Sequence, residues 1–245
     1  MAEKTVKTQA AVLRSYKYGE SDLILTLFGL STGKVSAIAK GARKTKNRMR
    51  GTLQLFSIGN YLLYKGKSLY TVTQCETEEP FVILRQDLSK FAYASYCTEV
   101  IGELLREEEP NVSAFRLLSF VLSLIASGQE EFAARLFDMR LLKISGFLPE
   151  MCRCVKCGGA LPERPVFSCV EGGAVCCGGK GVQLGKDTLA VMNNLSKMDM
   201  QKAHRLRPSA KNLKEMEQVT RAYWESILEK SLKSVEFIER MRQFA

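Results

Sequence analysis

The sequence predicts an α+β chain of several domains. These are a small five-stranded β-barrel at the N-terminus, a mostly α-helical C-terminal domain and a zinc-ribbon-like insert. Three observations lead to this fold class. Apolar and polar residues alternate in short runs over the first 80 residues, apolar residues follow a helical period after Pro80, and cysteines and glycines crowd into residues 151–180.

Residues 1–80 are predicted to form the barrel. The alternating runs are rich in Val, Ile, Tyr and Thr, and they lie at 9–16, 23–30, 34–40, 61–64 and 69–74. Turn-forming residues such as those at 31–33 and 65–68 separate the runs. Strands spaced by about 10 to 12 residues fit a barrel of the OB (oligonucleotide-binding) type. We therefore expect an OB-fold nucleic-acid-binding domain over residues 1–80.

Residues 81–150 and 181–245 are predicted to form one helical domain, which residues 151–180 interrupt. Apolar side chains recur every three, four or seven positions after Pro80 and again after the Pro110-Asn111 break. The stretch 130–145 is apolar on most sides, so we expect it to be a central core helix that ends near Gly146.

The charge pattern indicates a polyanionic partner. The 245 residues contain 36 Lys and Arg against 26 Asp and Glu, a net charge of +10. No acidic residue lies between Asp22 and Glu76, which makes this stretch a candidate phosphate-binding surface. Its candidate DNA-binding residues are Lys34, Lys40, Arg43, Lys44, Lys46, Arg48, Arg50, Lys65 and Lys67, and Arg205 and Arg207 are candidates for a C-terminal extension.

A basic loop at residues 40–51 carries most of this charge. It lacks apolar periodicity, so we expect a mobile loop between two barrel strands. Five tyrosines belong to the same domain: Tyr16, Tyr18, Tyr61, Tyr64 and Tyr70. Basic groups interleaved with aromatic ones are typical of single-strand binding, by phosphate attraction and base stacking, although about half of these tyrosines are expected in the core or at its rim.

The cysteine-rich insert at residues 151–180 is the strongest local motif. Cys154 and Cys157 form one C-x2-C knuckle, and Cys176 follows at the spacing of a zinc ribbon. The regular fourth ligand would be residue 179, which is Gly179, whereas Cys177 adjoins Cys176. We predict that the metal ligands are Cys154, Cys157, Cys176 and Cys177. Cys169, Cys152 and His204 are alternatives for the fourth ligand. We predict that the site holds one structural zinc ion. The alternative is a degenerate site in which the thiols bind no metal.

No enzyme signature is complete. Residues 29–34 resemble a phosphate-binding loop but are one residue short, and Val35 stands where a magnesium-binding hydroxyl belongs. The same residues spell G-x-S-x-G, but a predicted strand follows in place of a helix. We expect no catalytic residues, no nucleotide cofactor and no ATP hydrolysis. The absence of an 18-residue apolar run or a secretion signal predicts a cytoplasmic protein that does not bind membranes.

The order of these parts resembles the RecO family of bacterial DNA-repair proteins. Four stretches carry the resemblance: Tyr18 to Asp22 before a predicted strand, Gly33 to Arg43, Leu53 to Phe56, and Leu141 to Gly158. The resemblance implies a recombination mediator with an OB fold, a helical domain and a zinc-finger insert. Cys154, Cys157 and Cys176 match the two knuckles of the family's zinc-bearing members, and Gly179 departs from them.

The resemblance also implies activities and partners. It implies binding of single- and double-stranded DNA, annealing of complementary strands, and a place in the nucleoid. RecR and the C-terminal tail of the single-strand-binding protein SSB are the implied partners. With RecR, such a protein helps load the recombinase RecA onto SSB-coated strands.

Two other functions are open at this point. An RNA-binding zinc-ribbon protein of translation or transcription would have the same charge and cysteine pattern. A hydrolase would use Ser31 and His204.

The acidic residues Glu107, Glu108 and Glu109 are expected at a solvated helix end. If carboxylates of the helical part instead paired with the barrel lysines, that pairing would count against a phosphate-binding role for those lysines.

Overall fold

The computed structural model describes residues 5–45, 47–203 and 206–243. Its contacts group into two compact units, Met1–Gly128 with Glu236–Ala245 (the barrel unit) and Gln129–Val235 (the insert unit). None of the helices in the described ranges has the length and apolar character needed to cross a bilayer. The domain boundaries predicted near residues 80, 150 and 180 stay a prediction.

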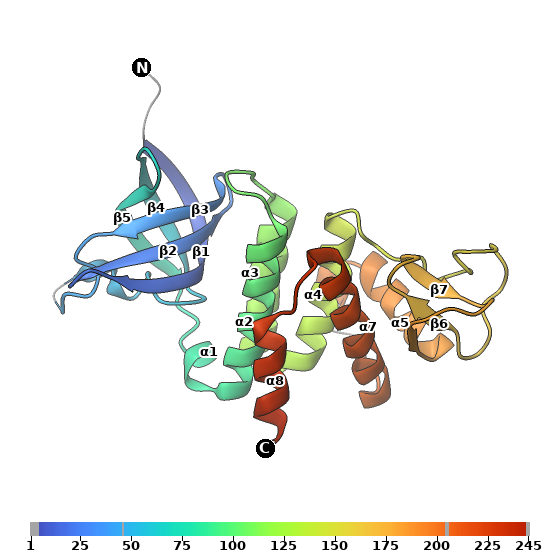
Figure 1. The fold of residues 1–245 in the computed structure, drawn as a ribbon. Coiled ribbons are helices and arrows are strands. Elements are labelled where there is room, and N and C mark those ends of the chain that lie inside the picture. Colours follow the sequence, from blue (N-terminus) through green and yellow to red (C-terminus); the bar gives the residue numbers. More distant parts are fainter. Residues whose placement is uncertain (1–4, 46, 204–205, 244–245) are drawn as a thin grey trace. The chain divides into compact units, whose positions relative to one another are not determined.

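The N-terminal strands close into the predicted five-stranded barrel (Figure 1). The strands are β1 (Thr5–Tyr18), β2 (Asp22–Gly29), β3 (Gly33–Ala39), β4 (Ile58–Lys65) and β5 (Tyr70–Glu79). Their order around the barrel is β1-β2-β3-β5-β4, and β1 pairs antiparallel with both β2 and β4. The parallel β3–β5 contact is short, because only Ala37 and Ile38 of β3 pair with β5. The rest of β3 therefore has an open side.

A β-bulge in β1 decides which residues face solvent. Val12 lies opposite Leu27, and both side chains belong to the barrel core. The register shifts between Val12 and Arg14, so one extra residue of β1 stands in the ladder there. Unbroken alternation from Val12 would turn Tyr16 inward, but after the bulge Tyr16 is 56% exposed opposite Ile24.

Helices follow the barrel where the periodicity predicts them. The barrel unit contains α1 (Ile83–Gln86), α2 (Leu88–Leu104), α3 (Val112–Ala126) and the larger part of α8 (Lys233–Gln243). Asp87 caps α2 and Asn111 caps α3, each through a side-chain oxygen that accepts a backbone N–H. Phe28 of the barrel packs against Phe115 of α3, with ring centroids 5.9 Å apart.

The insert unit combines helices with a small sheet. Its elements are α4 (Glu130–Ile144), β6 (Val166–Ser168), β7 (Gly173–Val175), β8 (Val182–Gln183), α5 (Lys186–Lys197), α6 (Met200–Ala203) and α7 (Ala210–Leu228). Helix α4 is buried along most of its length, as predicted for 130–145. Its Asp138 carboxylate is fully buried and accepts hydrogen bonds of 2.9 Å from Trp224 Nε1 and Thr220 Oγ1 of α7.

Candidate functional site

Most of the predicted DNA-binding residues are exposed on the barrel. Lys40, Arg43, Lys44, Arg48, Arg50, Lys65 and Lys67 are exposed, and Lys34 is half-buried. Arg207 is exposed in the insert unit. Lys46 and Arg205 lie outside the described residues.

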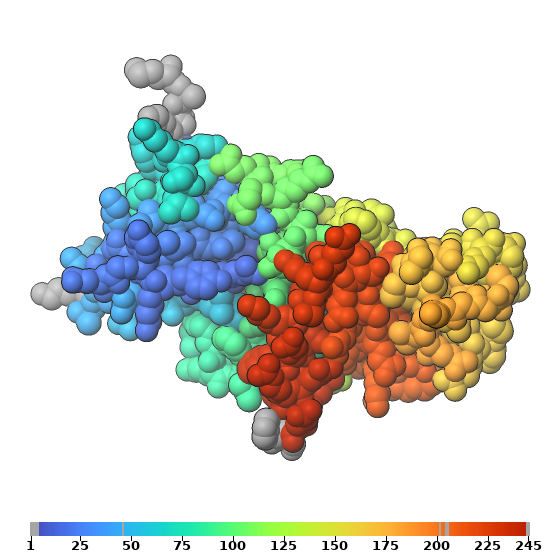
Figure 2. Space-filling view, in the orientation of Figure 1, coloured from blue at the N-terminus to red at the C-terminus, as the bar shows by residue number. Residues whose placement is uncertain are grey.

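The basic loop is attached to the turn between β1 and β2. The Asp22 carboxylate accepts a 2.7 Å hydrogen bond from the backbone N–H of Gly41. Arg43 donates its backbone N–H to Ser21 O at 2.8 Å, and its guanidinium donates to Glu20 O at 3.1 Å. Figure 2 shows the dark blue β1–β2 turn and the lighter blue loop together at one end of the barrel. These bonds restrain a loop that the sequence predicts to be mobile.

The second half of the basic loop has secondary structure of its own. Residues Arg48–Arg50 form a 3-10 helix, η1, whose N-cap is Asn47. The Asn47 side chain accepts the backbone N–H of Met49 at 2.8 Å and donates to Gly41 O at 2.9 Å. The cap closes the loop on itself, and Arg48 and Arg50 remain exposed.

Two of the five tyrosines share the outer face of β1, β2 and β3. Tyr16 and Tyr18 are 56% and 54% exposed. Tyr16 lies opposite Ile24, which lies opposite Ile38, so an apolar row crosses three strands. We call this surface, with Tyr18, the tyrosine face. The basic loop adjoins it because the loop is bonded to the turn that follows Tyr18.

The other three tyrosines are elsewhere. Tyr61 and Tyr70 are buried with the barrel core. Tyr64 is 41% exposed on β4. Two of the five are therefore core residues, as the composition of a small barrel leads one to expect.

An acidic segment of the helical part neutralises two barrel lysines. Residues 105–111, here the acidic strap, join α2 to α3 along the open side of β3. Glu108 donates its backbone N–H to Lys34 O at 2.8 Å, and Lys34 Nζ lies 3.4 Å from a Glu107 carboxylate oxygen. Lys65 Nζ lies 2.6 Å from Glu108 Oε2 and lowers the pKa of that carboxyl group. The three glutamates are exposed after the end of α2, as expected, but the strap is also bound to the barrel, which the sequence did not predict.

The ion pairs divide the cations into two groups. Lys34 and Lys65 have carboxylate partners from the strap. Five cations of the basic loop form no ion pair with any residue that the structure describes: Lys40, Arg43, Lys44, Arg48 and Arg50. The five loop cations therefore have their full charge available for an external anion, whereas Lys34 and Lys65 do not.

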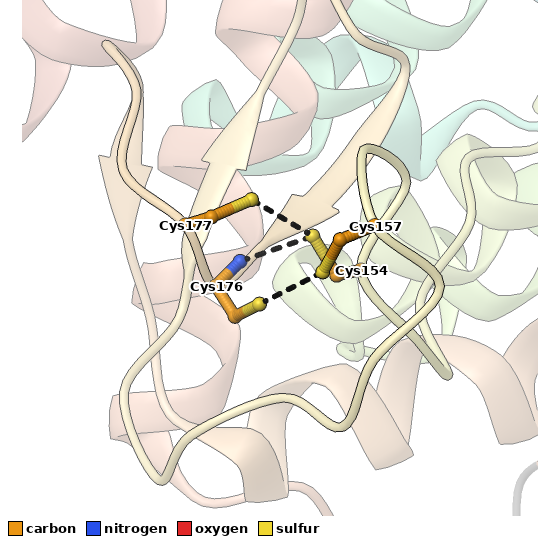
Figure 3. Close-up of side chains that lie close together, drawn as sticks. All are labelled: Cys154, Cys157, Cys176 and Cys177. Carbon is orange, nitrogen blue, oxygen red and sulfur yellow. Dashed lines mark hydrogen bonds between the residues drawn. The ribbon is translucent and has the colours of Figure 1, made fainter.

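Four cysteines of the insert come together in space (Figure 3). The sulfurs of Cys154, Cys157, Cys176 and Cys177 all lie within 4.8 Å of one another. Cys154 and Cys177 sulfurs are 3.7 Å apart, and those of Cys157 and Cys176 are 3.4 Å apart. Backbone turns hold them, since Gly158 donates its N–H to Cys154 O at 2.8 Å and has a left-handed φ of 72°.

The four sulfurs fit a tetrahedral metal ion. Zinc–sulfur bonds of about 2.3 Å place tetrahedral ligands about 3.8 Å apart, close to the observed separations. The backbone N–H of Cys176 also points at Cys154 Sγ, at 3.3 Å. Cys177 thus lies where it could supply the fourth ligand that the regular spacing assigns to position 179. Cys169 and Cys152 are not in the cluster, and His204 lies outside the described residues.

Hydrogen bonds shift the pKa values of the Cys154 and Cys176 thiols in opposite directions. Backbone N–H groups of Cys176 and Cys157 stabilise the Cys154 thiolate and lower its pKa to about 5. Hydrogen bonds to the Cys157 and Cys154 sulfurs raise the pKa of Cys176 to about 12. Negative charge therefore forms first at Cys154, and a cation at the centre of the cluster would displace protons from its neighbours.

Known proteins resemble the chain over nearly its whole length. The family model for the N-terminal part of recombination protein O matches residues 1–81, and that for its C-terminal part matches residues 85–236. A protein of Pelotomaculum thermopropionicum named DNA repair protein RecO is 38% identical over 245 residues, which cover 98% of this chain and 96% of the relative. A protein of the same name from Desulforamulus reducens is 33% identical over 244 residues, or 97% and 95% of the two chains.

Proposed function

The chain belongs to the RecO family of DNA-repair recombination mediators, and on that premise we propose that its barrel holds single-stranded DNA without reading its sequence. Family membership favours DNA repair over an RNA-binding protein of translation or transcription and over a hydrolase. We assign the chain no catalytic step.

One observation carries the proposal: the unpaired cations of the basic loop adjoin the exposed tyrosines. Single-strand binding without sequence preference combines cations that follow the phosphates with aromatic rings on which bases stack. Tyr16 and Tyr18 supply the rings. The loop supplies charge beside them, because Arg43 is bonded to the turn after Tyr18.

Strand annealing follows from the same surface. A strand whose phosphates are neutralised repels its complement less, so complementary bases can approach and pair. Neither the neutralisation of the phosphates nor the pairing of the bases requires ATP or another nucleotide cofactor. We extend the proposal to double-stranded DNA, whose phosphates would contact the same cations, with Lys67 and Arg207 as further candidates.

The implied partners rest on family membership alone. We propose that RecR and the SSB C-terminal tail bind this chain, and that together with RecR it helps load RecA onto SSB-coated single strands. We further propose that the four-cysteine cluster holds one structural zinc ion. Four thiolates would fill its coordination shell, so the ion would stabilise the insert and leave no open position for chemistry.

The test is strand pairing on SSB-coated complementary oligonucleotides without ATP. The wild-type chain should accelerate pairing. Replacing Tyr16 and Tyr18 together by Ala should weaken binding of a labelled single strand by about 5- to 150-fold for each stacked base lost. Their replacement by Phe should preserve binding.

Tyr64→Ala is the matched control, because Tyr64 is also exposed but lies on β4, off the tyrosine face. It should bind as the wild type does. Equal losses in both variants, or none in the Tyr16 and Tyr18 variant, would remove the tyrosine face from the proposal.

A further inference from the structure

A groove crosses the barrel on β1, β4 and β5, away from the tyrosine face. Its volume is about 1200 Å³. Residues of these three strands and of η1 line it, among them Lys7, Gln9, Arg48, Asn60, Leu62 and Gln74. Ordinary small-molecule pockets measure about 300–1,000 Å³, so the groove has room for more than one nucleotide.

Strand register arranges the groove residues in two outward rows. Gln9 lies opposite Asn60, which lies opposite Glu76. The neighbouring row is Lys7, Leu62 and Gln74. Adjacent strands are about 4.8 Å apart, so amide groups from three strands lie within reach of one extended ligand.

These side chains match the groups of a single nucleic-acid strand. The Asn60 and Gln74 amides each offer a donor and an acceptor, as base edges require. The Gln9 amide already donates to a Glu78 carboxylate oxygen, which leaves its own oxygen as an acceptor. Leu62 offers apolar contact to a base, and Glu76 can accept an exocyclic amino group. Lys7 and Arg48 are exposed and form no ion pair among the described residues, so both are available to phosphates.

The groove floor is neutral. Between the two outward rows lie Tyr61, which is buried, and Cys75, which is half-buried. Burial raises the pKa of the Cys75 thiol to about 11 and that of Tyr61 still further, so neither is ionised at neutral pH. A neutral floor with amides around it suits bases better than it suits a free inorganic anion.

We propose that this groove is a second single-strand site, so that one molecule holds two strands at once. The inference rests on the proposed function, which places the first strand on the tyrosine face. Arg48 connects the two surfaces, because it belongs to the basic loop and also lines the groove. Two strands on one small barrel would meet at high local concentration, and annealing would then need no second protein molecule.

The experiment measures how many DNA strands one molecule of the full-length chain binds. Native mass spectrometry with oligo(dT), which cannot pair with itself, should show complexes of one chain with two strands. Replacing Asn60 and Gln74 together by Ala should weaken the second binding step at least about tenfold and slow annealing of complementary strands, while the first step is unchanged. Both side chains are exposed, so the core is not altered.

The matched control replaces Asn194 and Gln218, two exposed amide residues of the insert unit, by Ala. It should bind two strands and anneal as the wild type does. A wild-type chain that takes up one strand only, or a groove variant that still binds two with unchanged affinity, would overturn the second site and leave the proposed function standing. A wild-type chain that binds no strand would refute the proposed function itself.

Discussion

Lys44 and Lys65 carry the same charge in different surroundings. Lys65 Nζ lies 2.6 Å from a Glu108 oxygen and 5.5 Å from the centre of the Tyr70 ring. Lys44 is exposed and forms no ion pair within the described ranges. Salt dependence of DNA binding arises from counterions that are released when cations neutralise phosphates. A lysine that already has a carboxylate partner contributes less to this release.

This difference predicts distinct salt responses. Five unpaired cations should give a slope of log affinity against log salt near −3.5 for a single strand, with about −0.7 from each phosphate contact. Lys44→Ala should therefore reduce the slope by about 0.7, and Lys65→Ala should leave it nearly unchanged. Fluorescence anisotropy of a labelled oligo(dT) across a salt series measures both. Equal changes in the two variants would show that the strap does not shield Lys65.

Single residues also show where prediction from sequence ends. Alternation predicts a strand through Tyr16, but not the side that Tyr16 faces, because the bulge after Val12 inserts one residue. Likewise, regular knuckle spacing assigns position 179 to the metal. In the structure Cys177, not residue 179, completes the cluster, because Cys176 and Cys177, just after β7, both turn toward the first knuckle.

At the scale of elements, the acidic strap connects the barrel with α2 and α3. Its Glu108 carboxylate has a lowered pKa because Lys65 stabilises the charged form. The unfolded chain therefore binds a proton at this group at a higher pH than the folded chain does. It follows that the ion pair stabilises the fold above the ordinary Glu pKa of 4.5, and that this contribution disappears as the pH falls through the lowered pKa.

We therefore expect Glu108→Gln to lower the Tm at pH 7 and to have no effect in acid well below pH 4.5. Thermal unfolding followed by circular dichroism over a pH series measures the difference. Glu109→Gln is the control, because the Glu109 side chain has no ion pair among the described residues. A Tm difference for Glu108→Gln that persists unchanged into acid would exclude the ion pair as its cause.

Sequence periodicity predicts the helices on both sides of this strap but not the strap's contacts. The ion pair between Lys65 and Glu108 joins residues 43 positions apart, and no local pattern encodes such a pairing. The backbone bond to Lys34 further depends on the open side of β3, which exists because β3 pairs with β5 only at Ala37 and Ile38.

At the scale of the whole molecule, the two candidate sites belong to different compact units. The tyrosine face, the basic loop and the groove lie in the barrel unit, and the four-cysteine cluster lies in the insert unit. Each unit has a core of its own: barrel side chains such as Leu27 fill the first, and α4 with Trp224 of α7 fills the second. Loss of order in one unit therefore need not abolish the chemistry of the other.

This separation predicts what metal removal does. A structural zinc ion contributes its binding free energy to folding, so chelation, or Cys177→Ser, should increase amide hydrogen exchange between residues 150 and 183. Single-strand affinity should stay unchanged, because its proposed determinants lie in the barrel unit. Elemental analysis should find one zinc ion per chain in the wild type and in the control Cys169→Ser, and none in Cys177→Ser. A parallel loss of strand affinity upon chelation would instead place the insert within the DNA-binding surface.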